Sequence, residues 1–418
     1  MDTRTTDMLP PTLADIEAAA DRLDGHVLKT PTIELRGLSD HLGCTVIAKL
    51  ENLQRTSSFK ERGALNKLQQ LTDEQAKAGV IAMSAGNHAQ GVAYHAAKLG
   101  IAATIVMPQD TPFTKVTRTK SFGAEVILHG ETLTQATQFA REKAASDALT
   151  FVHPFDDPDV IAGQGTIALE MLAALDEPLD AMIVPIGGGG LLSGMAIATR
   201  ALQPGIELVG VQSAEFPSMK QVLNNEPVVT GTGSLAEGIA VKEPGLLTRK
   251  IIAQHVDNIE IVPDSLIERA IYDLSQRAKL VAEGAGAAGL AALMANREKY
   301  AGKRVGLVIC GGNIDDRLYS NLLLRGMVNE QKIIQLRIAL PDRPGALAAI
   351  STVIGNAGGN IVEVQHQRLF NVVSVKSTTI DIVMETRGPL HAKQIVETLQ
   401  KQGFPVERLA EPKTEANP

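Results

Sequence analysis

The alternation of short apolar runs with longer helical stretches, sustained from about residue 45 to residue 310, constrains the fold more than any other feature of this chain. The apolar runs are rich in β-branched residues, and the stretches between them are rich in alanine and leucine. Near-continuous apolar strands separated by helices are typical of mostly parallel sheets with helices on both faces, so we predict an α/β fold. The predicted strands are 45–50, 79–83, 102–107, 125–128, 181–186, 207–212 and 304–309, and the predicted helices include 13–24, 86–99, 132–146 and 191–202.

The pattern changes near residue 331, where strands and helices follow each other in the order βαββαβ. This order is the ferredoxin-like plan, and the segment is self-contained. A chain of 418 residues is also too long for one ordinary core. We therefore predict two domains, residues 1–330 and residues 331–418. The predicted elements of the second domain are strand 333–340, helix 345–357, strands 360–368 and 376–385, helix 389–402 and a short strand at 404–408.

Composition excludes several classes of partner. The net charge of −7 leaves no basic surface of the kind that nucleic acids or acidic membranes require. No run approaches the roughly 18 apolar residues of a membrane span, and the first residues lack the apolar core of a signal peptide. Only two cysteines occur, Cys44 and Cys310, so we expect no disulfide framework. We predict a cytoplasmic protein that binds neither nucleic acid nor membrane.

Four consecutive glycines, Gly187, Gly188, Gly189 and Gly190, stand between a predicted strand and a predicted helix. This order presents several backbone N–H groups to a phosphate at a helix N-terminus. Side chains would block that approach, which explains the glycines. The spacing fits neither a P-loop nor the dinucleotide-binding fingerprint. We predict a phosphate-binding loop, the alternative being a merely flexible one.

Lys60 stands in the sequence SSFKERG. Ser57 and Ser58 are favourable N-cap residues, which would place Lys60 in the first turn of a helix, near its positive end. That position and partial burial both lower the pKa of an ammonium group and make the amine available as a nucleophile. The alternative is a surface charge at a helix start.

Two further motifs follow predicted strands. Ser84, Gly86, Asn87 and His88 belong to SAGNHAQG, whose hydroxyl, amide and backbone donors at a helix start can hold a carboxylate. A plain helix cap is the alternative. Cys310 closes the last predicted strand of the alternating region, at the edge where open α/β sheets bind ligands. The alternative there is a buried small hydrophobic residue.

SSFKERG, SAGNHAQG and GGGGL, in this order, make the chain resemble the fold-type II pyridoxal-phosphate enzymes, specifically the threonine and serine ammonia-lyase branch, over about residues 10–325. The resemblance implies two doubly wound open-sheet subdomains, the smaller at about 52–155, and pyridoxal 5′-phosphate as cofactor. It implies that Lys60 bears the cofactor's Schiff base, that Asn87 contacts the ring hydroxyl and that Cys310 faces the pyridine nitrogen. The residues implied at the cofactor are Phe59, Lys60, Asn87, Gly187, Gly188, Gly189, Gly190, Leu191, Glu283 and Cys310, and those at the substrate are Ser84, Gly86, Asn87 and His88.

Three single residues bear on the type of reaction and on metal binding. A neutral thiol at Cys310 would leave the cofactor ring a poorer electron sink than a carboxylate would, which favours loss of a β-hydroxyl over transamination. Ala85 stands where serine racemases have a second serine, so racemisation is not expected as the main activity. Gln212 stands where some relatives have a metal-binding carboxylate, and neither Glu215 nor Glu237 clearly replaces it, so we predict no metal.

The sequence PDRPG followed by a helix makes residues 333–409 resemble an ACT regulatory domain. ACT domains commonly pair side by side and bind small amino acids at the interface. The resemblance implies an effector site at Gly345, Ala346, Asn360 and Ile361. A domain that serves only for dimerisation is the alternative.

The resemblance as a whole implies a lyase that deaminates L-threonine to 2-oxobutanoate and ammonia, with conversion of L-serine to pyruvate as a side activity. It also implies regulation by isoleucine or valine, within isoleucine biosynthesis, and assembly as a homodimer or homotetramer. A serine or 3-hydroxyaspartate ammonia-lyase is the alternative among enzymes. An amino-acid sensor with an inactive catalytic domain is the alternative of another class.

Overall fold

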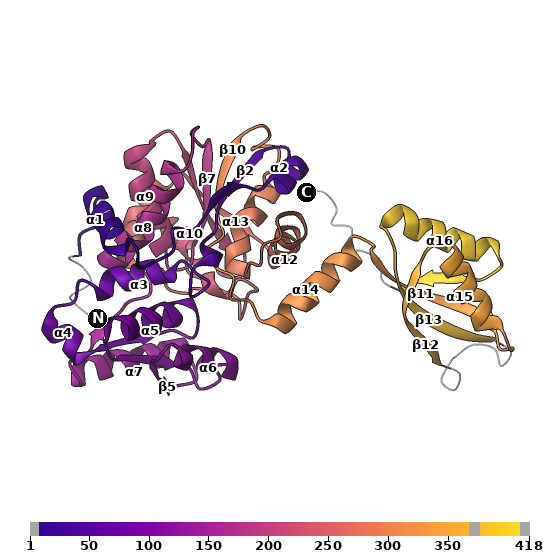
Figure 1. The fold of residues 1–418 in the computed structure, drawn as a ribbon, viewed down its shortest axis with the longest axis horizontal. Helices are drawn as coiled ribbons and strands as arrows, with labels where there is room; N and C mark the ends of the chain where they lie inside the picture. Colours follow the sequence, from indigo (N-terminus) through magenta and orange to yellow (C-terminus); the bar gives the residue numbers. More distant parts are fainter. Residues whose placement is uncertain (1–7, 368–376, 410–418) are drawn as a thin grey trace. The chain divides into compact units, whose positions relative to one another are not determined.

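The computed structural model describes residues 8–367 and 377–409, and its contacts divide the chain into two compact units, Met1–Ile314 and Asp315–Pro418 (Figure 1). The predicted boundary near residue 330 lies just after helix α14 (Asp316–Asn329), which belongs to the second unit. No helix in the described part of the chain is long and apolar enough to cross a membrane.

The larger sheet of the first unit has six strands. They are β1 (Thr32–Glu34), β2 (Thr45–Lys49), β7 (Ala181–Pro185), β8 (Glu207–Ser213), β9 (Asn258–Val262) and β10 (Arg304–Val308). Their order is β1-β2-β10-β7-β8-β9, and all pairs are parallel except β1 with β2. The central strands are buried almost throughout, which explains why they read as continuous apolar runs.

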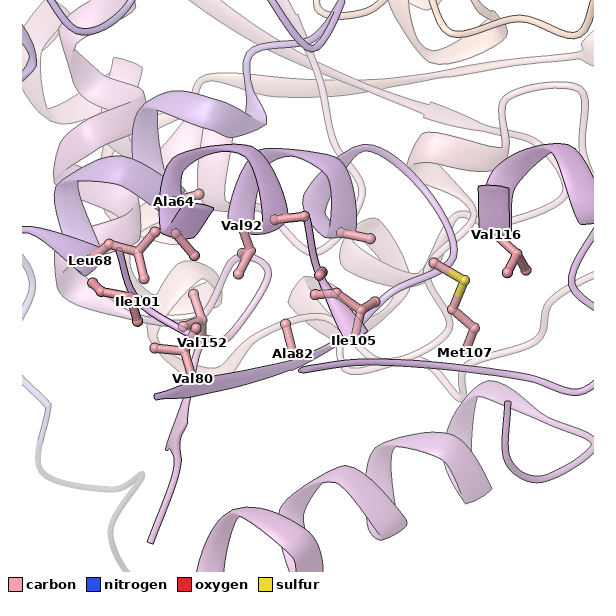
Figure 2. Packing of buried hydrophobic residues seen from close by; sticks show 14 residues of the cluster. Ala64, Leu68, Val80, Ala82, Val92, Ile101, Ile105, Met107, Val116 and Val152 are labelled. Atoms are coloured by element: carbon pink, nitrogen blue, oxygen red, sulfur yellow. The ribbon is translucent and has the colours of Figure 1, made fainter. Parts of the chain in front are cut away.

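The smaller sheet has four parallel strands in the order β5-β4-β3-β6. They are β3 (Val80–Met83), β4 (Ala103–Met107), β5 (Glu125–Leu128) and β6 (Thr150–Phe151). Successive strand residues face opposite sides. Val80, Ala82 and Ile105 point toward helix α5 (Asn87–Leu99), where Val92 meets them (Figure 2). Ile81 and Val106 face the other way, onto helix α7 (Leu133–Ser146), so helices cover both faces.

The helices of the first unit fill the space around the two sheets (Figure 1). Those beside the smaller sheet are α3 (Lys60–Leu68), α4 (Asp73–Ala78), α5, α6 (Phe113–Ser121) and α7. The others are α1 (Leu13–Leu23), α2 (Arg36–Leu42), α8 (Pro158–Ala173), α9 (Gly190–Leu202), α10 (Ser218–Leu223), α11 (Leu246–His255), α12 (Asp264–Asp273) and α13 (Gly284–Ala295). Short turns complete them: 3₁₀ helices η1 (Glu51–Leu53) and η2 (Glu237–Ile239), and the π-helical turn η3 (Leu274–Ala278).

Close helix packing joins the two sheets. Helix α8 packs against α3 on one side and α9 on the other. A Cβ atom on Gly163 of α8 would lie 2.7 Å from the Cα of Gly63 in α3. A Cβ atom on Gly194 of α9 would lie 2.2 Å from the carbonyl oxygen of Ile161 in α8. Because no larger residue fits at these crossings, the three helices have a fixed spacing. The position of the start of α3 relative to the start of α9 is therefore fixed.

The second unit is a four-stranded antiparallel sheet with two helices packed on it. After α14 its elements are β11 (Ile333–Pro341), α15 (Ala346–Asn356), β12 (Asn360–Gln367), β13 (Ser377–Glu385), α16 (Pro389–Lys401) and β14 (Val406–Arg408). The strand order is β12-β13-β11-β14. Leu336 and Ile338 of β11 pack with Ile382 of β13 against Ile354 of α15 and Ile395 of α16. The predicted βαββαβ order is confirmed.

The structure confirms the predicted α/β alternation, with element ends that differ by one or two residues. Three strands of the first unit were not predicted: β1, β6 and β9. β6 has only two residues and β1 only three, which is too short for a sequence pattern. Strand β9 is only partly buried, so it lacks the continuous apolar run by which the others were found.

Candidate active site

The start of α3 is attached to the chain segment that follows β10. The N–H of Phe59 donates to the carbonyl of Cys310 at 3.0 Å, and the N–H of Gly312 donates to the carbonyl of Ser57 at 2.9 Å. Ser58 and Gly311 form an isolated antiparallel bridge. Lys60 and Cys310 are 250 positions apart in sequence, and these bonds bring their backbones together.

The prediction that Ser57 and Ser58 cap the helix is wrong. Helix α3 begins at Lys60, the residue before it is Phe59, and no side chain caps it. Ser57 lies at φ 57°, and the hydroxyl of Ser58 is buried without a partner among the described residues. The backbone of this segment pairs with residues 310–312 instead, and neither hydroxyl caps the helix. Lys60 nevertheless lies in the first turn of the helix, as predicted, and is its first residue.

The Lys60 amine lies in a desolvated position. Its Nζ donates to the carbonyl of Pro154 at 2.7 Å and lies 5.2 Å from the centre of the Phe59 ring. Burial disfavours the ammonium form and lowers the pKa of Lys60 to about 8, with Cys310 and Glu283 opposing the shift. The neutral amine, which is the nucleophilic and basic form, is therefore accessible near neutral pH.

Asn87 lies at the start of α5 in a network of amides and a carboxylate. Its Nδ2 donates to Oε1 of Glu283 at 2.7 Å, and its Oδ1 accepts from Nδ2 of Asn313 at 2.7 Å. Burial raises the pKa of Glu283 to about 7, against the opposing effect of the Asn87 hydrogen bond. Burial also raises the pKa of the Cys310 thiol, with the negative charge of Glu283 adding to it. The thiol is therefore neutral at physiological pH.

The rest of SAGNHAQG forms a turn into α5. The hydroxyl of Ser84 accepts from the N–H of Gly86 at 3.1 Å, and a Cβ atom on Gly86 would meet no atom within 4 Å. The imidazole of His88 is buried, and its Nε2 lies 3.0 Å from the carbonyl of Val152. Burial lowers the pKa of His88 to about 3, so its ring is neutral. The space beside Gly86 is thus open, whereas the His88 ring is enclosed by protein.

The glycine loop lies between β7 and α9, as predicted, and helix α9 begins at Gly190. The N–H groups of residues 187–190 have no acceptor among the residues that the structure describes. Gly189 adopts φ 101°, which favours glycine. Leu191, the second residue of the helix, is buried. The loop thus offers free donors at a helix N-terminus.

The loop requires glycine because other residues pack closely behind its backbone. A Cβ atom on Gly188 would lie 2.3 Å from the ring of Phe155, and one on Gly190 would lie 2.9 Å from the Phe155 carbonyl oxygen. A Cβ atom on Gly189 would lie 2.7 Å from Cβ of Thr248, whose hydroxyl donates to the Gly188 carbonyl. Phe155 follows Pro154, the acceptor for Lys60, so one segment supports both the glycine loop and the lysine.

Glu237, weighed as a metal ligand from the sequence, forms an ion pair with Lys115 at 2.6 Å. The side-chain oxygen of Gln212 accepts from the N–H of Lys220 at 3.0 Å. No cluster of three histidine, cysteine or acidic side chains that could hold a metal occurs among the described residues.

The four effector-site candidates of the second unit fall into two pairs. Gly345, at φ 83°, and Ala346 lie at the start of α15, whereas Asn360 and Ile361 follow its end. A helix of 11 residues separates the pairs by about 16 Å. The amide of Asn360 also donates to Glu385 at 2.8 Å. One chain alone therefore does not bring the two pairs together.

Sequence reasoning gave no role to three groups that line the site: the carbonyl of Pro154, the ring of Phe155 and the amide of Asn313. A backbone carbonyl has no sequence signature, and Phe155 resembles any buried aromatic residue. Asn313 did have a signal, because it follows Cys310 in the same CGGN motif at a strand end.

Comparison with known proteins agrees with this geometry. Residues 23–311 match the family model of pyridoxal-phosphate dependent enzymes, and residues 334–404 match that of the ACT domain. The chain is 41% identical to an L-threonine ammonia-lyase of Thermotoga maritima, covering 94% of this chain and 98% of the relative. It is 43% identical to an L-threonine ammonia-lyase of Geobacter sulfurreducens, covering 96% and 100%. The solved structure of processed threonine deaminase isoform 2 from Solanum lycopersicum matches with a TM-score of 0.70 and 34% identity, covering 74% of this chain and 91% of that one.

Proposed function

Because this chain belongs to the pyridoxal-phosphate-dependent enzymes and carries an ACT domain, we propose that it is a lyase that deaminates L-threonine to 2-oxobutanoate and ammonia. One observation carries the choice of threonine. The two L-threonine ammonia-lyases at 41% and 43% identity are matched over both units rather than over the catalytic unit alone. Deamination of serine to pyruvate is expected as a side activity.

The residues of the site fit pyridoxal 5′-phosphate. The free N–H groups of the glycine loop, at the start of α9, suit its phosphate. The desolvated amine of Lys60 suits its aldehyde, and the neutral thiol of Cys310 suits an unprotonated pyridine nitrogen. Asn87 offers an amide to its ring hydroxyl, with Glu283 beside it. Phe59 and Leu191 complete the cofactor set as apolar walls.

The polar residues of the site then have the following roles. Ser84, Gly86 and the start of α5 hold the substrate carboxylate through backbone N–H groups and the Ser84 hydroxyl. The bound cofactor supplies an electron sink for the bond broken at the substrate Cα. Lys60 removes the Cα proton as general base, a role that its pKa of about 8 permits near neutral pH. Cys310, as a neutral thiol, leaves the sink moderate and so favours departure of the β-hydroxyl.

Regulation and assembly follow from the ACT domain. We infer that isoleucine or valine binds there and controls the catalytic unit. Because one chain holds its two pairs of effector candidates at opposite ends of α15, a site that uses both pairs needs a second copy of the chain. That requirement supports a homodimer or homotetramer. Cys44 and Cys310 are both free and buried, which suits the reducing cytoplasm that we propose as the location.

The deciding experiment measures initial rates of keto-acid release from L-threonine, L-serine and L-threo-3-hydroxyaspartate, with and without isoleucine or valine. We expect the highest kcat/KM for threonine and a change in rate or oligomer size with one effector. A higher kcat/KM for 3-hydroxyaspartate would replace the proposed substrate. A protein that binds the effector but turns over none of the three would be a sensor with an inactive catalytic domain.

A further inference from the structure

We propose that Asn313 is a positioning residue that sets which end of the Asn87 amide faces the cofactor. This inference rests on the proposed function, because it concerns the ring hydroxyl that Asn87 is proposed to contact. Its basis is a chain of hydrogen bonds that links Thr56, Asn313, Asn87 and Glu283.

The orientation of Asn313 follows from its backbone partner. Its side chain donates from Nδ2 to the carbonyl oxygen of Thr56 at 2.8 Å. A backbone carbonyl oxygen only accepts hydrogen bonds, so the NH₂ end of Asn313 must lie on this side. A side-chain amide can otherwise be turned by 180° with little change in shape, and here the Thr56 carbonyl decides between the two orientations.

The orientation of Asn87 follows in turn. The same Nδ2 of Asn313 lies 2.7 Å from the Asn87 side chain, so the Asn87 atom that faces it must be the acceptor, Oδ1. The opposite end of the Asn87 amide lies 2.7 Å from Oε1 of Glu283, which requires a donor there when Glu283 is ionised. Two independent partners, one at each end, therefore select the same orientation of Asn87.

The orientation of the Asn87 amide decides whether it offers a donor or an acceptor to the cofactor ring oxygen. The Nδ2 group of Asn87 carries two hydrogens, one of which Glu283 accepts. The second hydrogen is the donor that remains for a ring oxygen. Asn87 then favours the ionised form of that oxygen, because a hydrogen bond donated to a charged group stabilises the charged form. With the amide turned round, Asn87 would present an acceptor and favour the protonated hydroxyl.

Asn313 also joins the segments that carry the proposed cofactor contacts. Thr56 lies four residues before Lys60, and Asn313 lies three residues after Cys310. Asn87 opens α5. Loss of Asn313 should therefore act on the orientation of Asn87, whereas the backbone bonds between residues 57–59 and 310–312 still place the Lys60 segment.

Asn52 provides a matched control. It is a buried asparagine whose Nδ2 donates to a backbone carbonyl near the site, that of Val281, at 3.0 Å. Like Asn313, it has a buried Oδ1 without a partner among the described residues. Unlike Asn313, it does not contact Asn87. Asn52→Ala thus removes a similar tie without touching the Asn87 amide.

The test titrates the visible and near-ultraviolet absorbance bands of the bound cofactor in the holoenzyme, with no substrate present. We expect Asn313→Ala to lower the ratio of ionised to protonated ring form by about three- to tenfold at a given pH, the size of one hydrogen bond. Asn52→Ala should change it by less than about twofold. In an Asn87→Ala background, Asn313→Ala should have no further effect, since its action passes through Asn87.

The outcomes are distinct. An Asn313→Ala effect no larger than that of Asn52→Ala, or one that persists in the Asn87→Ala background, would overturn the role of Asn313. Asn313→Asp, which keeps the volume, replaces Asn313→Ala if the latter does not fold, and the same background separates positioning from the added charge. A wild-type protein that binds no cofactor would contradict the proposed function instead.

Discussion

Lys60 and Arg62 lie two residues apart on helix α3, and both are desolvated, yet their surroundings are opposite. The guanidinium of Arg62 contacts Glu51 at 2.8 Å and Glu170 at 2.7 Å, and the Arg62 side chain is fully buried. The Lys60 amine contacts a backbone carbonyl and an aromatic ring, and no carboxylate contacts it among the described residues.

The two environments shift the two pKa values in opposite directions. Burial alone would lower the pKa of Arg62, but Glu51 and Glu170 more than offset burial and raise it. Burial of Lys60 is opposed only in part, by Cys310 and Glu283, and its pKa falls to about 8. A buried cation that is paired holds its charge and fixes structure, whereas one that is left unpaired becomes a base. The same helix therefore carries an anchor and a reactive group.

The largest expected effect is that of removing the unpaired amine. Lys60→Ala should lower kcat for threonine by about 10³-fold or more, because the general base and cofactor anchor are both lost. The visible absorbance of the bound cofactor should disappear as well. Lys67→Ala is the control, since Lys67 lies on the same helix and pairs with Asp157 and Asp159. Retention of both absorbance and turnover in Lys60→Ala would contradict the assignment.

Removing the paired cation should affect stability instead. Arg62→Met takes the guanidinium partner from the fully buried carboxylate of Glu51 and leaves the part-buried Glu170 with Lys49 alone, which should lower the free energy of unfolding by about 3–5 kcal/mol. Denaturant titration measures the change. Lys143→Met, at an exposed ion pair with Asp147, should leave the transition midpoint unchanged. If Arg62→Met lowered the free energy of unfolding no more than Lys143→Met does, the Arg62 ion pairs would not stabilise the fold.

The contrast between Lys60 and Arg62 shows what sequence alone could supply. Lys60, the glycine loop, Asn87 and Cys310 could be proposed from the sequence because each lies at or near the end of a regular element, where position along the chain indicates position in space. The two carboxylates that contact Arg62 belong to residues 11 and 108 positions away in the sequence. Asn313 and Thr56, which are also hydrogen-bonded, are 257 positions apart. Such contacts depend on how the helices cross, which short patterns do not encode. The incorrect N-cap at Ser57 and Ser58 has the same origin, namely pairing with distant residues 310–312.

The pH dependence of cofactor binding tests whether burial lowers the pKa of the unpaired Lys60 amine. The neutral amine of Lys60 attacks the cofactor aldehyde, so the rate of binding to cofactor-free protein should follow the neutral fraction. With a pKa of about 8, that rate should rise about fifty-fold from pH 6 to pH 8 and level off above pH 9. Stopped-flow absorbance measures it. A lysine derivative free in solution, with a pKa near 10.4, should go on accelerating through pH 10. A Lys60 profile that also rises through pH 10 would mean that burial does not lower its pKa.

The smallest expected effect concerns Glu283, the carboxylate whose charge acts on the Lys60 amine. Glu283 acts against the burial shift of Lys60, so Glu283→Gln should lower the pKa of the amine further and move the plateau of the binding rate to lower pH. The gain at pH 8 is at most about twofold, because half of the amine is already neutral there. Glu237→Gln is the control, since Glu237 pairs with Lys115 instead. A plateau displaced to higher pH would show that Glu283 does not stabilise the charged amine, and that Lys60 is more isolated from carboxylates than its surroundings indicate.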